Sequence, residues 1–147
     1  MRYLLDVSSV LALLWENHLS HARVQAWAKN EGLAVCPITE LGFLRISTQS
    51  FGAAMDDARQ SLSAWLQKRR PNFIPCDERA LAGRKAPTGG KTTDFYLAHL
   101  AECHGMRLAT LDENITHNAV FVIPKPPSLA ASLLPSAPTP PRPPSAT

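Results

Sequence analysis

The alternation of apolar and polar positions along the chain predicts short buried strands separated by helices. The apolar runs typical of strands span residues 2–6, 33–36, 72–76, 107–111 and 119–123. Apolar residues spaced three and four apart predict helices between these runs. Short strands that alternate with helices are typical of βαβ units, with parallel strands and right-handed crossovers. The pattern therefore predicts an α/β fold, a three-layer α/β/α sandwich around a parallel sheet of roughly five strands.

Residues that commonly cap or stop helices set the boundaries of the predicted helices. Candidate N-terminal caps precede four of them, at Ser8 or Ser9, Ser20, Thr39 and Thr93. Glycines that commonly end a helix follow two of them, at Gly32 and Gly105. A longer amphipathic helix is predicted over about residues 55–70, and residues 77–91 are polar, with a helical turn expected near residues 78–82.

The composition changes near residue 124, where the alternating pattern ends. Nine of the 13 prolines lie between Pro124 and the C-terminus, and Ser, Ala and Thr fill most of the other positions. Such a segment has too few apolar residues to build a core. We therefore expect one domain over residues 1–123 and a Pro-rich, disordered tail over residues 124–147.

Deleting residues 127–147 is expected to change the melting temperature by little, because the predicted tail buries almost no apolar surface. The measurement is a thermal melt of the full chain beside the truncated chain. A cooperative loss of several degrees in the truncated chain would show instead that the tail packs on the domain.

Charge and cysteine content restrict the functional classes open to the chain. The formal net charge is +3, and Lys125 and Arg142 supply two of these charges. A domain this close to neutral must bind any RNA through local basic patches. The three cysteines match no zinc or CxxC pattern, which favours reduced, buried thiols in a cytoplasmic protein. No apolar run suggests a membrane span or a signal peptide.

Four acidic residues stand where a parallel sheet would bring them together. They lie at the ends of predicted strands or at the start of a predicted helix: Asp6, Glu40, Asp94 and Asp112. The carboxyl ends of parallel strands gather at one edge, and clustered carboxylates repel one another unless a cation is present. Oxygen ligands favour Mg²⁺ or Mn²⁺ over zinc. This donor set is typical of metal-assisted hydrolysis of a phosphodiester.

Each acid also has a structural interpretation when it is taken alone. Asp94 lies in a first helical turn, where the helix dipole favours a carboxylate. Asp112 can be a turn residue, and Glu40 can belong to a helix N-terminus. Asp6 is the hardest to explain in this way, because it follows a strand expected to be buried, where an unpaired carboxylate is costly.

Two other clusters carry weaker signals. His99 and Cys103 are four residues apart on one predicted helix, but no second pair of metal ligands stands near them in the sequence. Gly89, Gly90 and Lys91 resemble the end of a phosphate-binding loop that lacks its first glycine and its leading strand. We therefore predict neither a zinc site nor a phosphate-binding loop.

Four segments resemble the motifs of one known family. Residues 3–13 resemble the opening of PIN-domain proteins, a hydrophobic strand that ends in Asp and is followed by x-Asn/Ser. Residues 36–45 are similar to the second acidic motif of VapC-type toxins, and residues 93–101 and 105–112 resemble the third and fourth. The motifs occur in the family's order over about residues 1–123.

The resemblance implies a metal-dependent ribonuclease, the toxin of a VapBC-type toxin–antitoxin pair, which hydrolyses RNA with a metal-activated water. It implies that the four catalytic acids are Asp6, Glu40, Asp94 and Asp112. Asp6, Asp94 and Asp112 would be ligands of Mg²⁺ or Mn²⁺, and Glu40 would act through a water. Ser8 and Thr93 are expected near the site. The expected partners are RNA, a VapB-like antitoxin and a second copy of the chain in a homodimer.

Two other functional classes remain open. One is a PIN-like module that binds RNA or protein without cutting it, and the four intact acids argue against it. The other is a different α/β phosphohydrolase that acts through Asp6. An aspartyl-phosphate enzyme of the haloacid dehalogenase kind would be expected to carry Asp-x-Asp, whereas position 8 is Ser.

The apolar side chains of the first two predicted helices allow two interpretations. They either pack on the sheet or form a surface that receives an antitoxin tail. The residues in question are Leu11, Leu14, Trp15, Val24 and Trp27.

Overall fold

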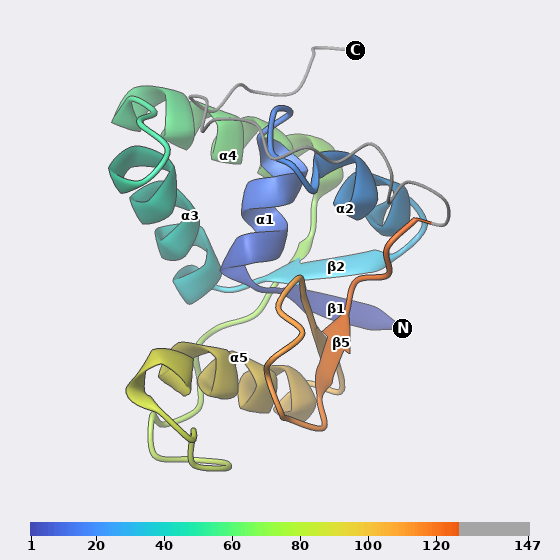
Figure 1. Cartoon of the computed structure of the whole chain (residues 1–147), viewed down its shortest axis with the longest axis vertical. Coiled ribbons are helices and arrows are strands. Elements are labelled where there is room, and N and C mark those ends of the chain that lie inside the picture. Colours follow the sequence, from blue (N-terminus) through green and yellow to red (C-terminus); the bar gives the residue numbers. More distant parts are fainter. Residues whose placement is uncertain (127–147) are drawn as a thin grey trace.

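The computed structural model of the chain describes residues 1–126 and contains one parallel sheet with helices on both faces (Figure 1). The strands are β1 (Arg2–Leu5), β2 (Gly32–Val35), β3 (Asn72–Phe73), β4 (Arg107–Thr110) and β5 (Val120–Val122). The helices are α1 (Val7–Leu14), α2 (His21–Ala28), α3 (Pro37–Gln49), α4 (Met55–Arg69) and α5 (Thr92–Cys103), with a short 3-10 helix η1 (Gly89–Lys91) before α5. The predicted three-layer sandwich is confirmed. Of the predicted tail, residues 127–147 lie outside the described part of the chain.

The strand order is β3-β2-β1-β4-β5, and every neighbouring pair is parallel. The chain first adds β2 and β3 on one side of β1, and then crosses to the other side to form β4 and β5. The strand order therefore reverses between β1 and β4. Open α/β sheets bind ligands outside the carboxyl ends of their strands at such a point. The register pairs Leu5 with Ala109, so β1 and β4 end side by side.

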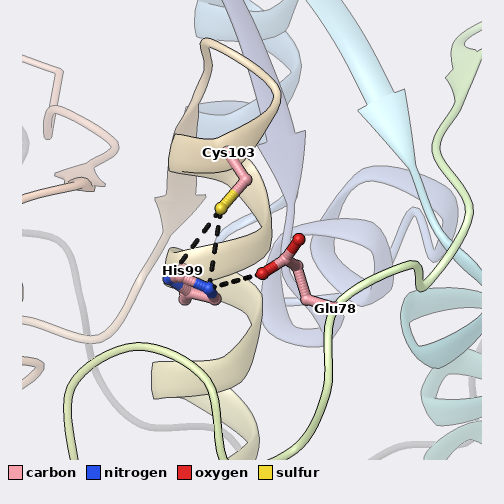
Figure 2. A group of neighbouring side chains, drawn as sticks. All are labelled: Glu78, His99 and Cys103. Atoms are coloured by element: carbon pink, nitrogen blue, oxygen red, sulfur yellow. Dashed lines mark hydrogen bonds and ion pairs between the residues drawn. The ribbon is translucent and has the colours of Figure 1, made fainter.

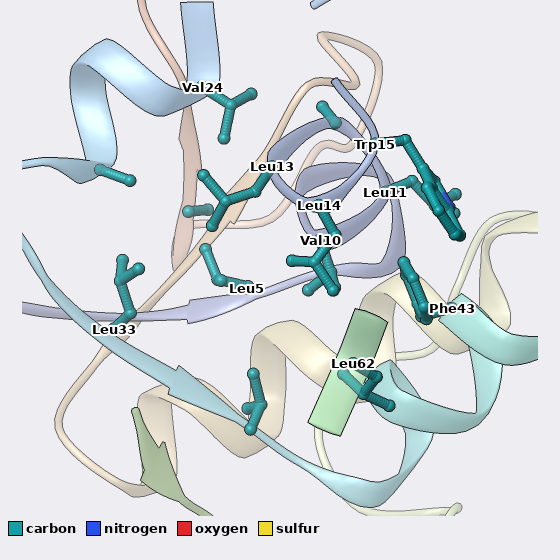
Figure 3. Close-up of a cluster of buried hydrophobic side chains, with 14 of the residues drawn as sticks. Leu5, Val10, Leu11, Leu13, Leu14, Trp15, Val24, Leu33, Phe43 and Leu62 are labelled. Carbon is teal, nitrogen blue, oxygen red and sulfur yellow. The ribbon is translucent and has the colours of Figure 1, made fainter. Parts of the chain in front are cut away.

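Alternating side chains of the strands pack against the two helical layers. Leu5 and Val35 belong to the core cluster beneath α1 to α4, which also contains Phe43 and Leu62 (Figure 3). Leu4 points to the opposite face, in the cluster built on α5. Six of the eight residues of α1 are buried, which makes α1 the central helix of its layer.

The apolar residues of α1 and α2 pack in the core, so the interpretation of this set as an antitoxin surface is wrong. Leu11, Leu14, Trp15 and Val24 are all buried. Trp15 stacks on Phe43 and donates a hydrogen bond from Nε1 to Ser47 Oγ at 2.8 Å. The fifth member of the set, Trp27, is partly buried and meets Tyr3 edge to face at 5.1 Å.

Several predicted boundaries are corrected by the structure. α1 is capped by Asp6, not by Ser8 or Ser9, and α5 has Lys91 at its cap position, so Thr93 lies inside the first turn. β3 has two residues where five were predicted. The strand is short because its partner β2 ends at Val35, where the Ile74 N–H makes the last ladder bond, and the chain then turns into α3 at Pro37. The turn expected near residues 78–82 forms at residues 79–82, closed by a hydrogen bond from the Ala82 N–H to the Arg79 carbonyl oxygen at 3.0 Å.

The cysteines and helix lengths bear on two further expectations. Cys36 is buried as predicted, but Cys76 and Cys103 are exposed free thiols. In residues 1–126, the helices are too short or too polar for any of them to cross a membrane.

Candidate active site

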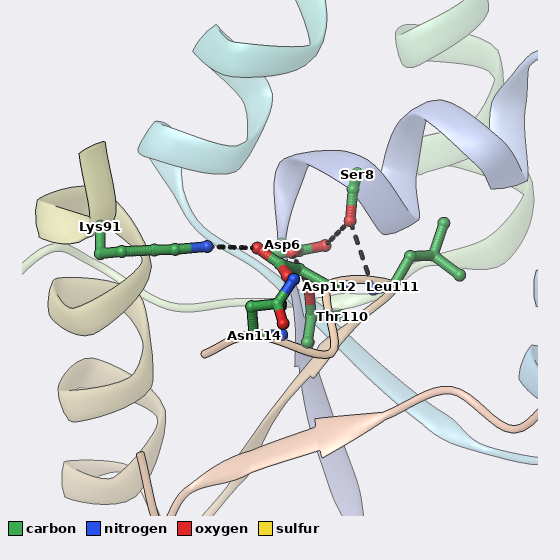
Figure 4. A network of polar contacts seen from close by, with 7 residues as sticks. All are labelled: Asp6, Ser8, Lys91, Thr110, Leu111, Asp112 and Asn114. Atoms are coloured by element: carbon green, nitrogen blue, oxygen red, sulfur yellow. Dashed lines mark hydrogen bonds and ion pairs between the residues drawn. The ribbon is translucent and has the colours of Figure 1, made fainter. Parts of the chain in front are cut away.

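Asp6 lies at the end of β1 with 4% of its surface exposed, and three donors hold its carboxylate. Figure 4 shows Ser8 and Thr110 beside it. Its Oδ1 accepts hydrogen bonds from Ser8 Oγ and the Ser9 backbone N, each at 2.8 Å. Its Oδ2 accepts one from Thr110 Oγ1 at 2.5 Å. The bond from Ser9 caps α1, so the turn from strand to helix fixes the position of the carboxylate.

Burial raises the pKa of Asp6 above its ordinary value, and the hydrogen bonds from Thr110, Ser9 and Ser8 offset only part of this effect. The folded chain therefore disfavours the ionised form of this carboxyl group. A cation beside Asp6 would stabilise the ionised form. Such an environment fits a carboxylate that binds a positive charge.

Asp94 lies in the first turn of α5 and is half-buried. Burial raises its pKa first, and the charges of Asp6 and Asp112 raise it further, while Lys91 acts in the opposite direction. Asp6 and Asp112 are therefore both close enough to Asp94 to disfavour its ionised form. The structure thus brings Asp6, Asp94 and Asp112 together from the ends of β1 and β4 and the start of α5.

Asp112 is the acid of this cluster with a cation beside it. Lys91 reaches across from the start of α5, and its Nζ lies 2.7 Å from Asp112 Oδ2 (Figure 4). The other oxygen, Oδ1, accepts from the Asn114 backbone N at 2.8 Å. The hydrogen bond from Lys91 is the largest cause that lowers the pKa of Asp112. Asp112 is therefore ionised at neutral pH even without a metal ion.

Thr110 and Ser8 connect the ends of β1 and β4. Thr110 Oγ1 donates to Asp6 and accepts from the Asp112 backbone N at 3.0 Å. Ser8 Oγ donates to Asp6 and accepts from the Leu111 backbone N at 3.4 Å. The two hydroxyl groups therefore hold the Asp6 carboxylate directly, and they also bind the backbone of the loop that carries Asp112. Thr93, which was also expected near the site, has an exposed side chain.

Sequence reasoning missed the parts played by Thr110 and Lys91 in this cluster. Thr110 precedes Asp112 by two positions at the end of a strand. Lys91 precedes Asp94 by three positions, the spacing at which side chains meet on a helix. Both spacings can be read from the sequence. Whether Thr110 and Lys91 contact the acids of the cluster, however, depends on which strands end side by side.

Glu40 stands apart from the other three acids electrostatically. It lies in the first turn of α3, where Thr39 Oγ1 donates to the Leu5 carbonyl oxygen at 2.9 Å and so ties the start of α3 to the end of β1. Burial alone accounts for the raised pKa of Glu40, and none of the other acids contributes to it. The start of α3, which carries Glu40, is thus joined to the end of β1, and Glu40 also lines a groove between α3 and α4.

This α3/α4 groove has a volume of about 670 Å³. Its lining is apolar along the two helices and polar at its margins: Pro37, Glu40, Leu41, Leu44, Arg59, Leu62, Ser63, Leu66 and Gln67. Leu41 is 65% exposed, which is unusual for a leucine on a helix that faces its neighbour. The groove therefore offers an apolar surface that begins at the first turn of α3, the turn that Thr39 ties to the end of β1.

The donor set of the cluster fits a hard divalent cation. Its charged groups are carboxylates, and hydroxyl groups from Ser8 and Thr110 orient the most buried one. Mg²⁺ and Mn²⁺ prefer such oxygen ligands. Burial raises the pKa of both Asp6 and Asp94, and the charges of Asp6 and Asp112 raise that of Asp94 further. A cation at this place would relieve both effects.

Residues 3–120 match the family described as PIN domain. The chain is 36% identical to ribonuclease VapC38 of Mycobacterium tuberculosis over 124 residues, an alignment covering 76% of this chain and 86% of that protein. It is 33% identical over 131 residues to ribonuclease VapC44 of the same organism, with coverage of 82% and 92%. Ribonuclease VapC29, also from this organism, is 36% identical over 122 residues, with coverage of 80% and 90%. The chain therefore belongs to the PIN domain family and, within it, to the VapC proteins.

Proposed function

We propose that this chain is a divalent-metal-dependent endoribonuclease and the toxin of a VapBC-type toxin–antitoxin pair. The observation that supports this most strongly is the convergence of Asp6, Asp94 and Asp112 where the strand order of a PIN domain reverses. The relatives that the chain resembles over most of its length are named ribonucleases. A domain of residues 1–123 would contain all of these elements.

Each residue of the site has a proposed role. Asp6, Asp94 and Asp112 would hold Mg²⁺ or Mn²⁺, and Glu40 would act through a water. When bound, the ion would lower the pKa of the attacking water and stabilise charge on the leaving oxygen. Ser8 and Thr110 fix the orientation of Asp6, which keeps its carboxylate in place as the charges around it change.

Lys91 has a separate proposed role beside these acids. Its ammonium group offsets part of the negative charge of Asp112 and lies at the edge of the cluster. An RNA phosphate that approaches the acids would meet this cation first. Lys91 would therefore reduce the repulsion between the acid cluster and the substrate.

The direct test is incubation of the purified chain with RNA in Mg²⁺ or Mn²⁺. Internal cleavage, seen as new 5′ and 3′ ends, is expected for RNA. If the folded protein binds RNA but cuts none of it in the presence of Mg²⁺ or Mn²⁺, the alternative of a non-catalytic binding module is correct. If it hydrolyses phosphomonoesters and leaves RNA intact, the alternative of another phosphohydrolase is correct.

We further propose that the α3/α4 groove receives a segment of a VapB-like antitoxin. Leu41, Leu44 and Leu66 offer apolar contacts for a helix or an extended strand. Glu40 and Arg59 add one charge of each sign at the margins. An arginine of the bound segment could extend from the groove to the carboxylates and replace the charge of the metal ion.

Leu41→Asp is expected to weaken antitoxin binding at least tenfold, because it places a charge on the apolar wall of the groove. Leu19→Asp is the matched control, since Leu19 is 71% exposed and lies outside the groove. The measurement is co-purification of each variant with the product of the neighbouring upstream gene, followed by a binding titration. Equal affinities for the two variants would place the antitoxin elsewhere, and an active wild-type complex would contradict the toxin–antitoxin assignment.

We also propose that the chain forms a homodimer and acts in the cytoplasm, where its RNA substrate would be found. Exposed apolar side chains such as Met55 and Phe73 supply surface for self-association. Light scattering of the purified chain at several concentrations measures the mass directly. A monomer at all concentrations would exclude the homodimer.

A further inference from the structure

Three side chains able to bind a metal meet on the exposed side of α5, away from its N-terminus (Figure 2). His99 and Cys103 come from successive turns of the helix, and Glu78 comes from the loop after β3. His99 Nε2 lies 2.8 Å from Glu78 Oε1 and 3.5 Å from Cys103 Sγ. One ligand atom from each residue lies within 4.8 Å of the other two.

These separations are close to those of a tetrahedral metal site. With metal–ligand distances of about 2.0–2.1 Å for nitrogen and oxygen and about 2.3 Å for sulfur, bound nitrogen and sulfur atoms lie about 3.6 Å apart. Bound nitrogen and oxygen atoms lie about 3.4 Å apart. The observed pair of nitrogen and sulfur atoms already has this spacing. The glutamate oxygen lies at hydrogen-bond distance from the nitrogen and would need to move away from it by roughly half an ångström or more.

Neighbouring groups hold two of the three ligands in place. Gly83 packs directly on the His99 ring, so closely that a Cβ at position 83 would lie 2.6 Å from two ring atoms. Its φ of +78° also favours glycine. Tyr96 donates a hydrogen bond from its hydroxyl group to the Glu78 carbonyl oxygen at 2.7 Å, which fixes the backbone that carries Glu78.

The three ligands are separate from the acid cluster. Asp94 lies in the first turn of α5, whereas His99 and Cys103 lie five and nine residues later, about 7 and 14 Å along the helix axis. Their donor atoms also differ in kind, because imidazole and thiolate favour zinc-like ions and carboxylates favour Mg²⁺. The two sets of side chains therefore favour different ions.

We propose that Glu78, His99 and Cys103 form a second metal site, one that takes Zn²⁺ or a chemically similar ion. His99 binds as neutral imidazole and Cys103 as thiolate, and the thiol proton is released to solvent. Three protein ligands leave a fourth position for water or for a ligand from another molecule. No third metal ligand stands beside His99 and Cys103 in the sequence. Glu78 lies 21 residues before His99 and reaches α5 only in the folded chain.

The proposed metal would attach the loop of residues 77–91 to α5. Without an ion, this loop is joined to α5 by the contact of Glu78 with His99 and by that of Asp77 with His104 at 3.0 Å. The same loop ends in Lys91, which contacts Asp112 in the acid cluster. Metal binding would therefore limit the motion of the segment that delivers this cation to the candidate active site.

Titration of the full chain with Co²⁺ tests the site, because a bound thiolate gives cobalt a charge-transfer absorption band in the near ultraviolet. One equivalent is expected to produce the band, and Zn²⁺ should remove it by displacement. Cys103→Ser should abolish the band, and His99→Gln should weaken binding at least about tenfold. Residues 127–147 contain no His, Cys, Asp or Glu that could compete.

Two controls keep the result independent of the proposed ribonuclease. Cys76→Ser removes an exposed thiol outside the cluster, and Asp6→Asn removes an acid of the other site; both should keep the band. Absence of the band in the folded wild-type chain, or its survival in Cys103→Ser, would overturn the proposal. The measurement needs no RNA, so a chain that fails to cut RNA can still bind cobalt.

Limited proteolysis tests the attachment of the loop. Trypsin can cut after Arg79, Arg84 and Lys85, which all lie in exposed parts of this segment. Zn²⁺ should slow these cuts severalfold in the wild-type chain and leave their rate unchanged in Cys103→Ser. Equal protection of both proteins would show that the ion acts elsewhere, and no protection of either would show that the loop is not clamped.

Discussion

Asp6→Asn is expected to lower RNA cleavage by at least about a hundredfold while leaving the domain folded. The substitution removes the negative charge that the metal ion would bind but keeps the size of the side chain. The amide oxygen can still accept from Ser9, so the cap of α1 survives. The measurements are an RNA cleavage assay and a thermal melt of the same preparation.

The melting temperature of Asp6→Asn in metal-free buffer should equal or exceed that of the wild-type chain at neutral pH. The folded state raises the pKa of Asp6, chiefly through burial, so keeping this group ionised at neutral pH costs stability. The wild-type chain should regain that stability as the pH falls from above the raised folded pKa towards the ordinary unfolded value. Each kcal/mol relieved corresponds to about 4 °C for a domain of this size.

The pH dependence separates this effect from a general gain in stability. Asn is neutral at every pH, so the difference between the two melting temperatures should shrink as the solution is acidified. Asp57→Asn is the matched control, because Asp57 is exposed in the first turn of α4. It should cut RNA at the wild-type rate. A folded Asp6→Asn chain that also cuts at that rate would refute the assignment of Asp6 to the metal site.

Chelation of divalent ions by EDTA is expected to abolish RNA cleavage, and added Mg²⁺ or Mn²⁺ should restore it. The reason is that the candidate active site offers carboxylates and hydroxyl groups, and Lys91 is the cation that contacts one of its acids. An ammonium group cannot activate a water molecule as a metal ion does. Cleavage that persists at the full rate in EDTA, with metal removal verified by elemental analysis, would contradict the proposed metal dependence.

The same ions should raise the melting temperature of the wild-type chain more than that of Asp6→Asn. An ion that binds only the folded state stabilises it by about 2.7 kcal/mol at a hundred times its dissociation constant. Cys103→Ser separates this response from the second metal site. This variant should retain the Mg²⁺ stabilisation, because its thiol lies outside the acid cluster.

The sequence determined the fold class because the relevant information is local. The period of apolar residues distinguishes strands from helices without reference to the rest of the chain. The helix predicted over about residues 55–70 therefore appears at residues 55–69. Asp6 and Asp112 could likewise be placed at the ends of strands, and Asp94 in a first helical turn, by counting along the sequence.

The cap of α1 shows where local reasoning reached its limit. Ser8 and Ser9 are good capping residues, but Asp6 takes that position because the strand before it ends in the core beside β4. Thr110 then binds the same carboxylate from 104 residues away. The cap bond from the Ser9 N–H to Asp6 is local, but the bond from Thr110 that holds the same carboxylate is one that no window of sequence contains.

The contacts on which both proposed metal sites rest were decided by the tertiary structure. Strand order placed β1 beside β4, and this pairing brought Asp6, Asp112 and Lys91 close to Asp94. The path of the loop after β3 brought Glu78 to His99 and Cys103. The sequence by itself determined which residues have the right chemistry and which elements carry them. Only the folded chain determined which of them meet, because long-range pairing depends on how whole layers pack and not on the spacing of residues along the chain.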